Sequence, residues 1–215
     1  LSASEIYRQV VYISKKCLEV HNQPLTNIVF MGMGEPLLNY KNVLRSIHFI
    51  TSEEGLNMSY KRITLSTSGI SKMIRKLADD NVKVNLALSL HAANEELRKK
   101  IMPIGKSNTL EEIRDSLKYY FSKTKKKVTY EYVLLRDVND SIEDAYQLYK
   151  YTKHLSSKVN IIEYNAVEGL EFKKSSFEKT EKFIGYLLKK GVNVSLRRSR
   201  GKDINAACGQ LANKN

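Results

Sequence analysis

The sequence has 215 residues, 42% of them hydrophobic, and a formal net charge of +13. This length is typical of one domain with a sizeable core, and the apolar runs are too short for a membrane-spanning helix. The positive charge favours a polyanionic partner such as nucleic acid, because each neutralised phosphate releases counterions; a lysine-rich but otherwise ordinary surface is the alternative.

The two cysteines, Cys17 and Cys208, are too few for a disulfide framework. No charged and then apolar leader precedes the first elements. We therefore expect a protein of the reducing cytoplasm that has no membrane partner.

Short β-rich runs alternate with amphipathic helical stretches along the chain. The first residues predict a helix with Ser4 as its cap. The expected strands are Asn27–Met31, Arg62–Ser66, Val82–Leu90, Val128–Leu135, Val159–Tyr164 and Val192–Arg197. The expected helices are Tyr40–Ser52, Ser71–Asp79, Thr109–Lys123, Ser141–His154 and Ser175–Lys190. Capping boxes or close relatives of them are expected at Thr109 with Glu112 and at Ser141 with Asp144, and Gly191 is expected to stop the last helix.

This alternation predicts the α/β class, with a largely parallel sheet covered by helices that is either doubly wound or a closed or partial barrel. No linker rich in Pro or Gly interrupts it. We expect one domain over residues 1–215, with residues 191–215 as a C-terminal extension.

Polar residues follow the expected strands, and the carboxyl ends of parallel strands share one edge, where such folds bind ligands. Turn chemistry alone explains each motif taken singly, but together they predict one site. The candidates are Gly34, Glu35, Ser66, Ser89, His91 and Asn165.

Two of these candidates leave an alternative open. Glu35 offers a carboxylate to a cationic group, and Pro36 keeps it extended at the strand end; a tight turn with a solvated Glu35 is the other interpretation. His91 follows a strand and could contact a ligand, although a lone histidine is more often structural.

Cys208 lies in a small, polar turn after Arg197, Arg198, Arg200 and Lys202. Structural thiols usually lie in apolar runs, whereas reactive thiols lie in electropositive, partly exposed places. Cys208 is thus either a reactive thiol or an inert small residue.

Glu131 lies inside an expected strand and needs a partner if it faces the interior. The histidines and cysteines lack metal-ligand spacing, so no metal site is predicted.

Six motifs in order, from about Ser4 to Asn213, resemble the radical S-adenosylmethionine (SAM) methyltransferases of the RlmN/Cfr group. They are FMGMGEPLLNY, ITLSTSG, ALSLHA, YEYVLL, the turn at Asn165, and SRGKDINAACGQLA. The resemblance implies a partial (β/α)6 barrel that binds SAM at the strand carboxyl ends.

Residue by residue, the resemblance places Gly34 and Glu35 at the methionyl amine of SAM, and Ser66, Ser89, Leu90, His91 and Asn165 along the rest of the site. It makes Cys208 the catalytic residue, which carries the methyl group as a thioether. It also implies a [4Fe–4S] cluster that cleaves a second SAM and starts radical chemistry on an adenine ring carbon.

One departure from the family pattern is large. The C-x-x-x-C-x-x-C cluster loop is absent, and Cys17 on the first helix matches none of its cysteines. We therefore expect a fragment that lacks the first barrel strand and the cluster loop, that binds SAM weakly and that transfers no methyl group by itself.

For the full-length parent the resemblance implies methylation of C2 of an adenine in 23S rRNA, with tRNA as a further candidate substrate, an electron donor such as flavodoxin, and a monomer. Methylation of adenine C8, or a non-catalytic basic RNA-binding domain, are the alternatives. A SAM-independent enzyme with Cys208 as nucleophile is disfavoured, because no His–Cys pairing signature is present.

Overall fold

The computed structural model describes residues 1–31, 34–102, 108–167 and 169–198. Six strands form one sheet in the order β1 (Ile28–Phe30), β2 (Ile63–Thr67), β3 (Asn85–Ser89), β4 (Val128–Leu134), β5 (Ser157–Glu163) and β6 (Val194–Arg197). Every neighbouring pair is parallel. The predicted α/β class with a parallel sheet is therefore confirmed.

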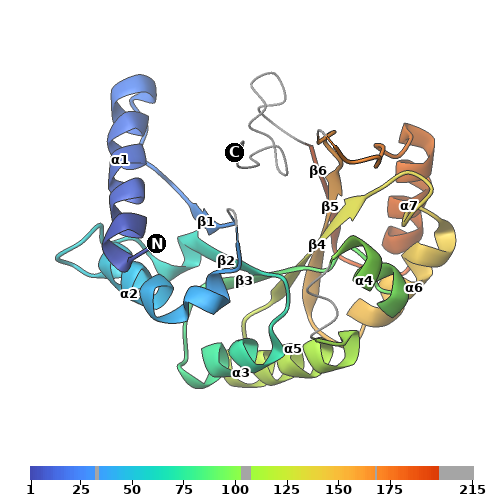
Figure 1. Cartoon of the computed structure of the whole chain (residues 1–215), viewed down its shortest axis with the longest axis horizontal. Helices are drawn as coiled ribbons and strands as arrows, with labels where there is room; N and C mark the ends of the chain where they lie inside the picture. The colour runs from blue at the N-terminus through green and yellow to red at the C-terminus, as the bar shows by residue number, and fades with distance from the viewer. Residues whose placement is uncertain (32–33, 103–107, 168, 199–215) are drawn as a thin grey trace.

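Helices connect the strands and lie on the outer side of the curved sheet (Figure 1). They are α1 (Ala3–His21), α2 (Tyr40–Thr51), α3 (Ser71–Asp79), α4 (Glu95–Ile101), α5 (Leu110–Thr124), α6 (Ile142–Thr152) and α7 (Phe177–Lys189), with short 3-10 helices at Pro36–Asn39 and Tyr60–Arg62. Each sequential crossover places its helix against the same face, as right-handed β/α units do. The sheet is open among the described strands, because β1 and β6 are its two edges.

Apolar side chains repeating at helical spacing form the core between the sheet and its helices. Ile47 and Ile50 of α2 and Ile74 and Leu77 of α3 are all buried, and Leu65 of β2 lies in the same cluster. Burying one such side chain contributes about 1.5–3 kcal/mol. This core fixes the strands, and therefore also the loops at their ends.

The predicted elements are largely confirmed, including the capping boxes of α5 and α6 and a last helix that ends at Lys189, just before Gly191 at φ +74°. Ser4 is a wrong prediction. The cap of α1 is Ser2, because Glu5 lies three residues after it and the two residues bond reciprocally. Strand β3 begins at Asn85 rather than Val82, opposite Thr64 of β2. Helix α4 was not predicted.

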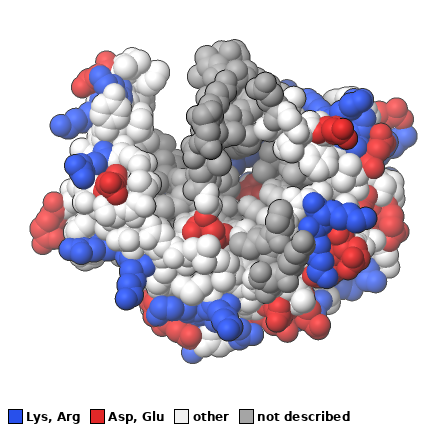
Figure 2. All heavy atoms as spheres, in the orientation of Figure 1, with Lys and Arg blue, Asp and Glu red and all other residues white. Residues whose placement is uncertain are grey.

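Lysine and arginine side chains are distributed around the periphery on the face shown in Figure 2, where they alternate with acidic side chains. Several lysine and arginine side chains of the described residues pair with an acidic residue of their own helix, as Lys182 does with Glu178 and Lys16 with Glu19. The positive charge is thus spread rather than concentrated on this face. None of the described helices is both long and apolar enough to span a bilayer.

Candidate ligand-binding site

A cavity of about 360 Å³ opens at the carboxyl ends of β3, β4 and β5. Its walls are mainly apolar, formed by Met31, Ile101, Val133, Leu135, Ile162, Val167, Leu170 and Phe172. A few polar side chains converge on it, namely Ser89, His91, Glu131, Glu163, Tyr164 and Asn165. Such a mixture is typical of small-molecule sites, in which apolar walls bury the ligand and a few polar groups orient it.

The predicted residues divide between two hollows. Ser89, His91 and Asn165 line the cavity, whereas Gly34 and Glu35 line a second hollow of about 570 Å³ beside β1 and α1. Met31 borders both hollows. Ser66 and Leu90 are buried and line neither of them.

Glu35 joins the loop after β1 to the loop after β2. One carboxylate oxygen accepts the N–H of Leu37 at 3.0 Å. The other accepts both the N–H and the hydroxyl of Ser68, at 2.7 and 2.6 Å. The extended backbone that Pro36 was expected to impose is present (φ −117°, ψ 112°). Because a carboxylate has about four lone-pair sites, Glu35 keeps one of them for a cationic ligand.

His91 adopts a left-handed backbone conformation (φ +57°) two residues after the end of β3. Its Nδ1 accepts the backbone N–H of Val133 at 3.1 Å. Burial, with the charge of Arg98 adding to it, lowers the pKa of His91 to about 4. The imidazole is therefore neutral near pH 7 with its proton on Nε2, which makes it a hydrogen-bond donor at the cavity.

Four polar residues in one register row cross the sheet beneath this cavity. Ser89 of β3 pairs with Glu131 of β4, Glu131 with Asn160 of β5, and Asn160 with Ser195 of β6. The hydroxyl of Ser195 donates to Asn160 Oδ1 at 2.8 Å, and Asn160 Nδ2 donates to Glu131 Oε1 at 2.9 Å. We call these four residues the polar row.

Glu131 is only 4% exposed. Burial raises the pKa of Glu131, and the hydrogen bond from Asn160 and the charges of Arg197 and Lys158 oppose that rise. The sequence indicated that Glu131 needs a partner such as an arginine. The partner that the structure provides is Asn160, and no ion pair joins Glu131 to a cation within the described ranges.

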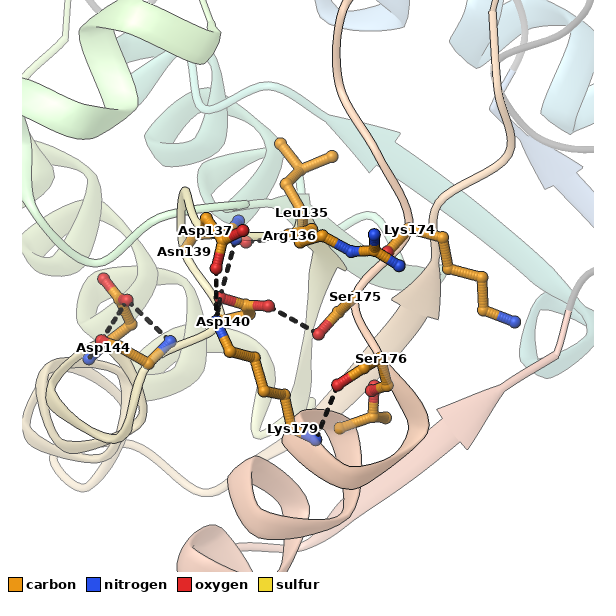
Figure 3. A network of polar contacts seen from close by, with 12 residues as sticks. Leu135, Arg136, Asp137, Asn139, Asp140, Asp144, Lys174, Ser175, Ser176 and Lys179 are labelled. Carbon is orange, nitrogen blue, oxygen red and sulfur yellow. Dashed lines mark hydrogen bonds and ion pairs between the residues drawn. The ribbon is translucent and has the colours of Figure 1, made fainter.

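A clamp of polar contacts holds the wall of the cavity that follows Asn165 (Figure 3). Buried Asp140, after β4, accepts hydrogen bonds from the hydroxyl of Ser175 at 2.6 Å and from Lys179 of α7 at 3.3 Å. Arg136 donates from Nε to the carbonyl of Lys174 at 2.9 Å. These contacts fix residues 173–179, and thereby the segment with Leu170 and Phe172.

Arg98 of α4 is a site residue that the sequence analysis did not identify. It is 2% exposed, and its guanidinium donates to the carbonyl of Ser68 at 2.5 Å and to that of Ser89 at 3.5 Å. It thus ties the ends of β2 and β3 together. The signal that could have found it is Asn94, an N-cap followed by two acidic residues and then three basic ones, which is a helix signature.

The structure describes one of the two cysteines. Cys208, the predicted catalytic residue, lies outside the described residues. Cys17 is a half-buried free thiol on α1. No group of three His, Cys, Asp or Glu side chains in the described part of the chain could hold a metal ion.

Residues 5–149 match the model of the Radical SAM superfamily. The chain belongs to that superfamily. Membership supports SAM and a [4Fe–4S] cluster as its cofactors.

Two curated proteins are similar in sequence to this chain along its whole length. The chain is 55% identical over 214 residues to a probable dual-specificity RNA methyltransferase RlmN of Flavobacterium psychrophilum, and 42% identical to a dual-specificity RNA methyltransferase RlmN of Nautilia profundicola. Both alignments cover all of this chain. They cover only 62% of the first relative and 60% of the second. The chain therefore spans about three fifths of the length of these curated relatives.

Solved structures agree with the fold. A radical SAM methyltransferase from Sphaerobacter thermophilus matches with a TM-score of 0.95 at 40% identity, over 98% of this chain and 61% of that one. Streptococcus suis SuiB, solved with bound S-adenosylmethionine, matches with a TM-score of 0.62 at 17% identity, over 92% of this chain and 43% of that one, and so shares the fold.

The two cofactors fit this chain unequally. The cavity, with a buried carboxylate and a neutral histidine at mainly apolar walls, suits a nucleoside such as that of SAM. A [4Fe–4S] cluster needs several thiolates, and the sequence has only Cys17 and Cys208. The residues present do not form a cluster site.

Proposed function

We propose that this chain is the SAM-binding barrel of an RNA methyltransferase that methylates C2 of an adenine in 23S rRNA, with tRNA as a second substrate. The observation that carries the proposal is the cavity that gathers Ser89, His91 and Asn165, three positions assigned to SAM by the family resemblance. The names of the relatives, which are dual-specificity RNA methyltransferases, support RNA as the substrate.

In this proposal each hollow receives one end of SAM, which supplies the methyl group. Glu35, held by Ser68, accepts the methionyl ammonium together with the backbone of Gly34. The neutral His91 donates from Nε2 to the nucleoside end, and Asn165 lines the same cavity. Ser66 and Leu90 contribute through the backbone at the ends of β2 and β3.

Cys208 carries the methyl group to the RNA in this proposal. The basic residues before it favour a thiolate, which is the form of cysteine that accepts a methyl group. The protein is proposed to act as a cytoplasmic monomer that takes electrons from a donor such as flavodoxin.

The test is methylation of unmodified 23S rRNA by the full-length, cluster-loaded protein, with the nucleosides read by mass spectrometry. We expect 2-methyladenosine, and none from Cys208→Ala. Detection of 8-methyladenosine alone would contradict C2 methylation and support methylation of adenine C8 instead. RNA binding without any methylation would instead support a non-catalytic RNA-binding domain.

A further inference from the structure

One oxygen of the Glu131 carboxylate accepts a hydrogen bond, and the other has no donor among the described residues. Oε1 accepts from Asn160, and Asn160 cannot turn its amide without losing the bond that Ser195 donates to Oδ1. Oε2 is buried, and no donor of the described residues reaches it. Glu131 lines the cavity, so the polar row places a buried acceptor oxygen that has no donor next to it.

Such an oxygen is costly for the unliganded fold, because a buried acceptor without a donor has lost its hydration and gained nothing in return. An arginine would be the usual compensation. Arg197 lies on β6 two residues after Ser195, opposite Ile162 of β5, but it makes no ion pair with Glu131. A donor supplied by a ligand accounts for this arrangement.

The surroundings of Glu131 indicate the chemistry of that ligand. Val133 and Ile162 lie next to it along β4 and β5, and Leu170 and Phe172 line the same cavity, so a flat base finds apolar contacts there. In dinucleotide-binding folds an Asp or Glu carboxylate accepts a hydrogen bond from a ribose hydroxyl of the bound nucleotide, and Glu131 has the same chemistry.

We propose that Glu131 holds the ribose hydroxyls of SAM through Oε2, and that Asn160 and Ser195 are positioning residues that aim it. This inference rests on the proposed SAM site. It adds a ligand-contacting residue on β4 that is distinct from His91 and Asn165, and it places the ribose at the centre of the polar row.

The test is anaerobic calorimetric titration of the full-length, cluster-loaded protein with SAM and with its 2′-deoxy and 3′-deoxy analogues. Loss of a hydrogen bond to a charged acceptor corresponds to roughly a tenfold to hundredfold loss of affinity. We expect that loss for at least one deoxy analogue in the unchanged protein. In Glu131→Gln, SAM itself should bind about tenfold more weakly, and the difference between SAM and the analogue should shrink to about threefold or less.

Two variants separate ligand contact from structural support. Ser195→Ala should bind SAM more weakly, because Asn160 then loses the hydrogen bond that orients its amide. The ratio of the affinity for SAM to the affinity for the deoxy analogue should fall, but less than in Glu131→Gln. Glu178→Gln is the matched control, since it makes the same change on α7, where the carboxylate pairs with Lys182 at 2.6 Å and lines neither hollow. The ratio should not change in that variant. Glu131→Gln should melt at or above the temperature of the unchanged protein, because it removes a buried charge.

Two results overturn the inference in distinguishable ways. If Glu131→Gln keeps both the affinity for SAM and the full discrimination against deoxy analogues, the inference fails and the proposed SAM site stands. If the unchanged protein binds no SAM at all, the proposed function fails and the inference fails with it.

Discussion

The side-chain amide of Asn139 donates hydrogen bonds to the carbonyls of His91 and Val133, at 2.7 and 2.8 Å. Its oxygen accepts the N–H of Leu135 at 2.7 Å, and the residue is fully buried. One side chain thus ties the loop after β3 to the loop after β4. It holds His91 in the left-handed conformation that directs the imidazole to Val133.

Asn139→Ala should therefore destabilise the fold strongly. Each buried partner left without a hydrogen bond costs about 1–3 kcal/mol, and three partners are affected, so we expect a loss of roughly 3 kcal/mol or more in the free energy of unfolding. Urea denaturation measures it. Asn27→Ala is the control, because exposed Asn27 bonds only to Thr26 and should change stability by less than about 0.5 kcal/mol. Equal effects of the two substitutions would contradict this role of Asn139.

The strands and most helices could be predicted because their signals are local. Capping boxes, apolar spacing and the glycine after α7 are each read within a few residues. Helix α4 was not predicted from the sequence because it has only seven residues and its buried face is occupied by Arg98 rather than by an apolar side chain.

The site was predictable only in part, for a different physical reason. Parallel pairing brings the strand ends together, so the convergence of Ser89, His91 and Asn165 followed from the alternation of strands and helices. The polar row did not follow, because the pairing of Glu131 with Asn160 is set by register between segments about thirty residues apart. A shift of one residue would turn the side chain away from its partner. Local sequence does not encode that register.

The clamp over the cavity should depend on its buried member more than on its exposed ones. Asp140→Ala leaves the hydroxyl of Ser175 and the N–H of Asp137 without an acceptor. We expect a loss of roughly 2–4 kcal/mol in the free energy of unfolding. Lys179→Met removes only a half-exposed cation, so its loss should be clearly smaller than that of Asp140→Ala.

Thermal melts at low and at high salt measure both variants of the clamp. The small effect of Lys179→Met should diminish further at high salt, because screening weakens exposed ion pairs. A larger effect for Lys179→Met than for Asp140→Ala would show that the ion pair, rather than the buried hydrogen bonds, holds the segment with Phe172.

Two glycines should respond to alanine in opposite directions. Gly69, after β2, has φ +102°, and an added Cβ would lie 2.8 Å from Ile113 Cδ1 and 3.1 Å from Leu88 Cδ1. Gly185 lies inside α7 with open space around it. Gly69→Ala should lose roughly 1–3 kcal/mol of stability, whereas Gly185→Ala should gain about 0.5–1 kcal/mol.

Chemical denaturation of the two glycine variants beside the unchanged protein gives both signs in one experiment. Because Gly69 adjoins Ser68, which bonds to Glu35, Gly69→Ala should also weaken SAM binding. Gly185→Ala should leave that binding unchanged. A stabilising Gly69→Ala would mean that Ile113 moves aside without cost.

His91 should give the fold a pH dependence with a definite sign. Its pKa is about 4 in the folded chain and about 6.5 in the unfolded chain. Between about pH 6.5 and pH 4, His91 is protonated in the unfolded chain but stays neutral in the folded chain. The free energy of unfolding therefore falls as the pH is lowered through this range, and it levels off below about pH 4. The full effect corresponds to roughly 3 kcal/mol. Burial is its main cause, with the charge of Arg98 adding to it.

Asn at position 91 isolates this effect. Asn tolerates the left-handed backbone and can accept the N–H of Val133, but it does not titrate in this range. Subtracting the urea-unfolding curve of His91→Asn from that of the unchanged protein, between pH 4 and 8, should leave a slope between about pH 4 and 6.5 only. Carboxylates that titrate in the same range are common to both proteins and cancel. Parallel curves would mean that His91 takes up its proton in the folded chain at its ordinary pKa, and that burial does not hold the imidazole neutral.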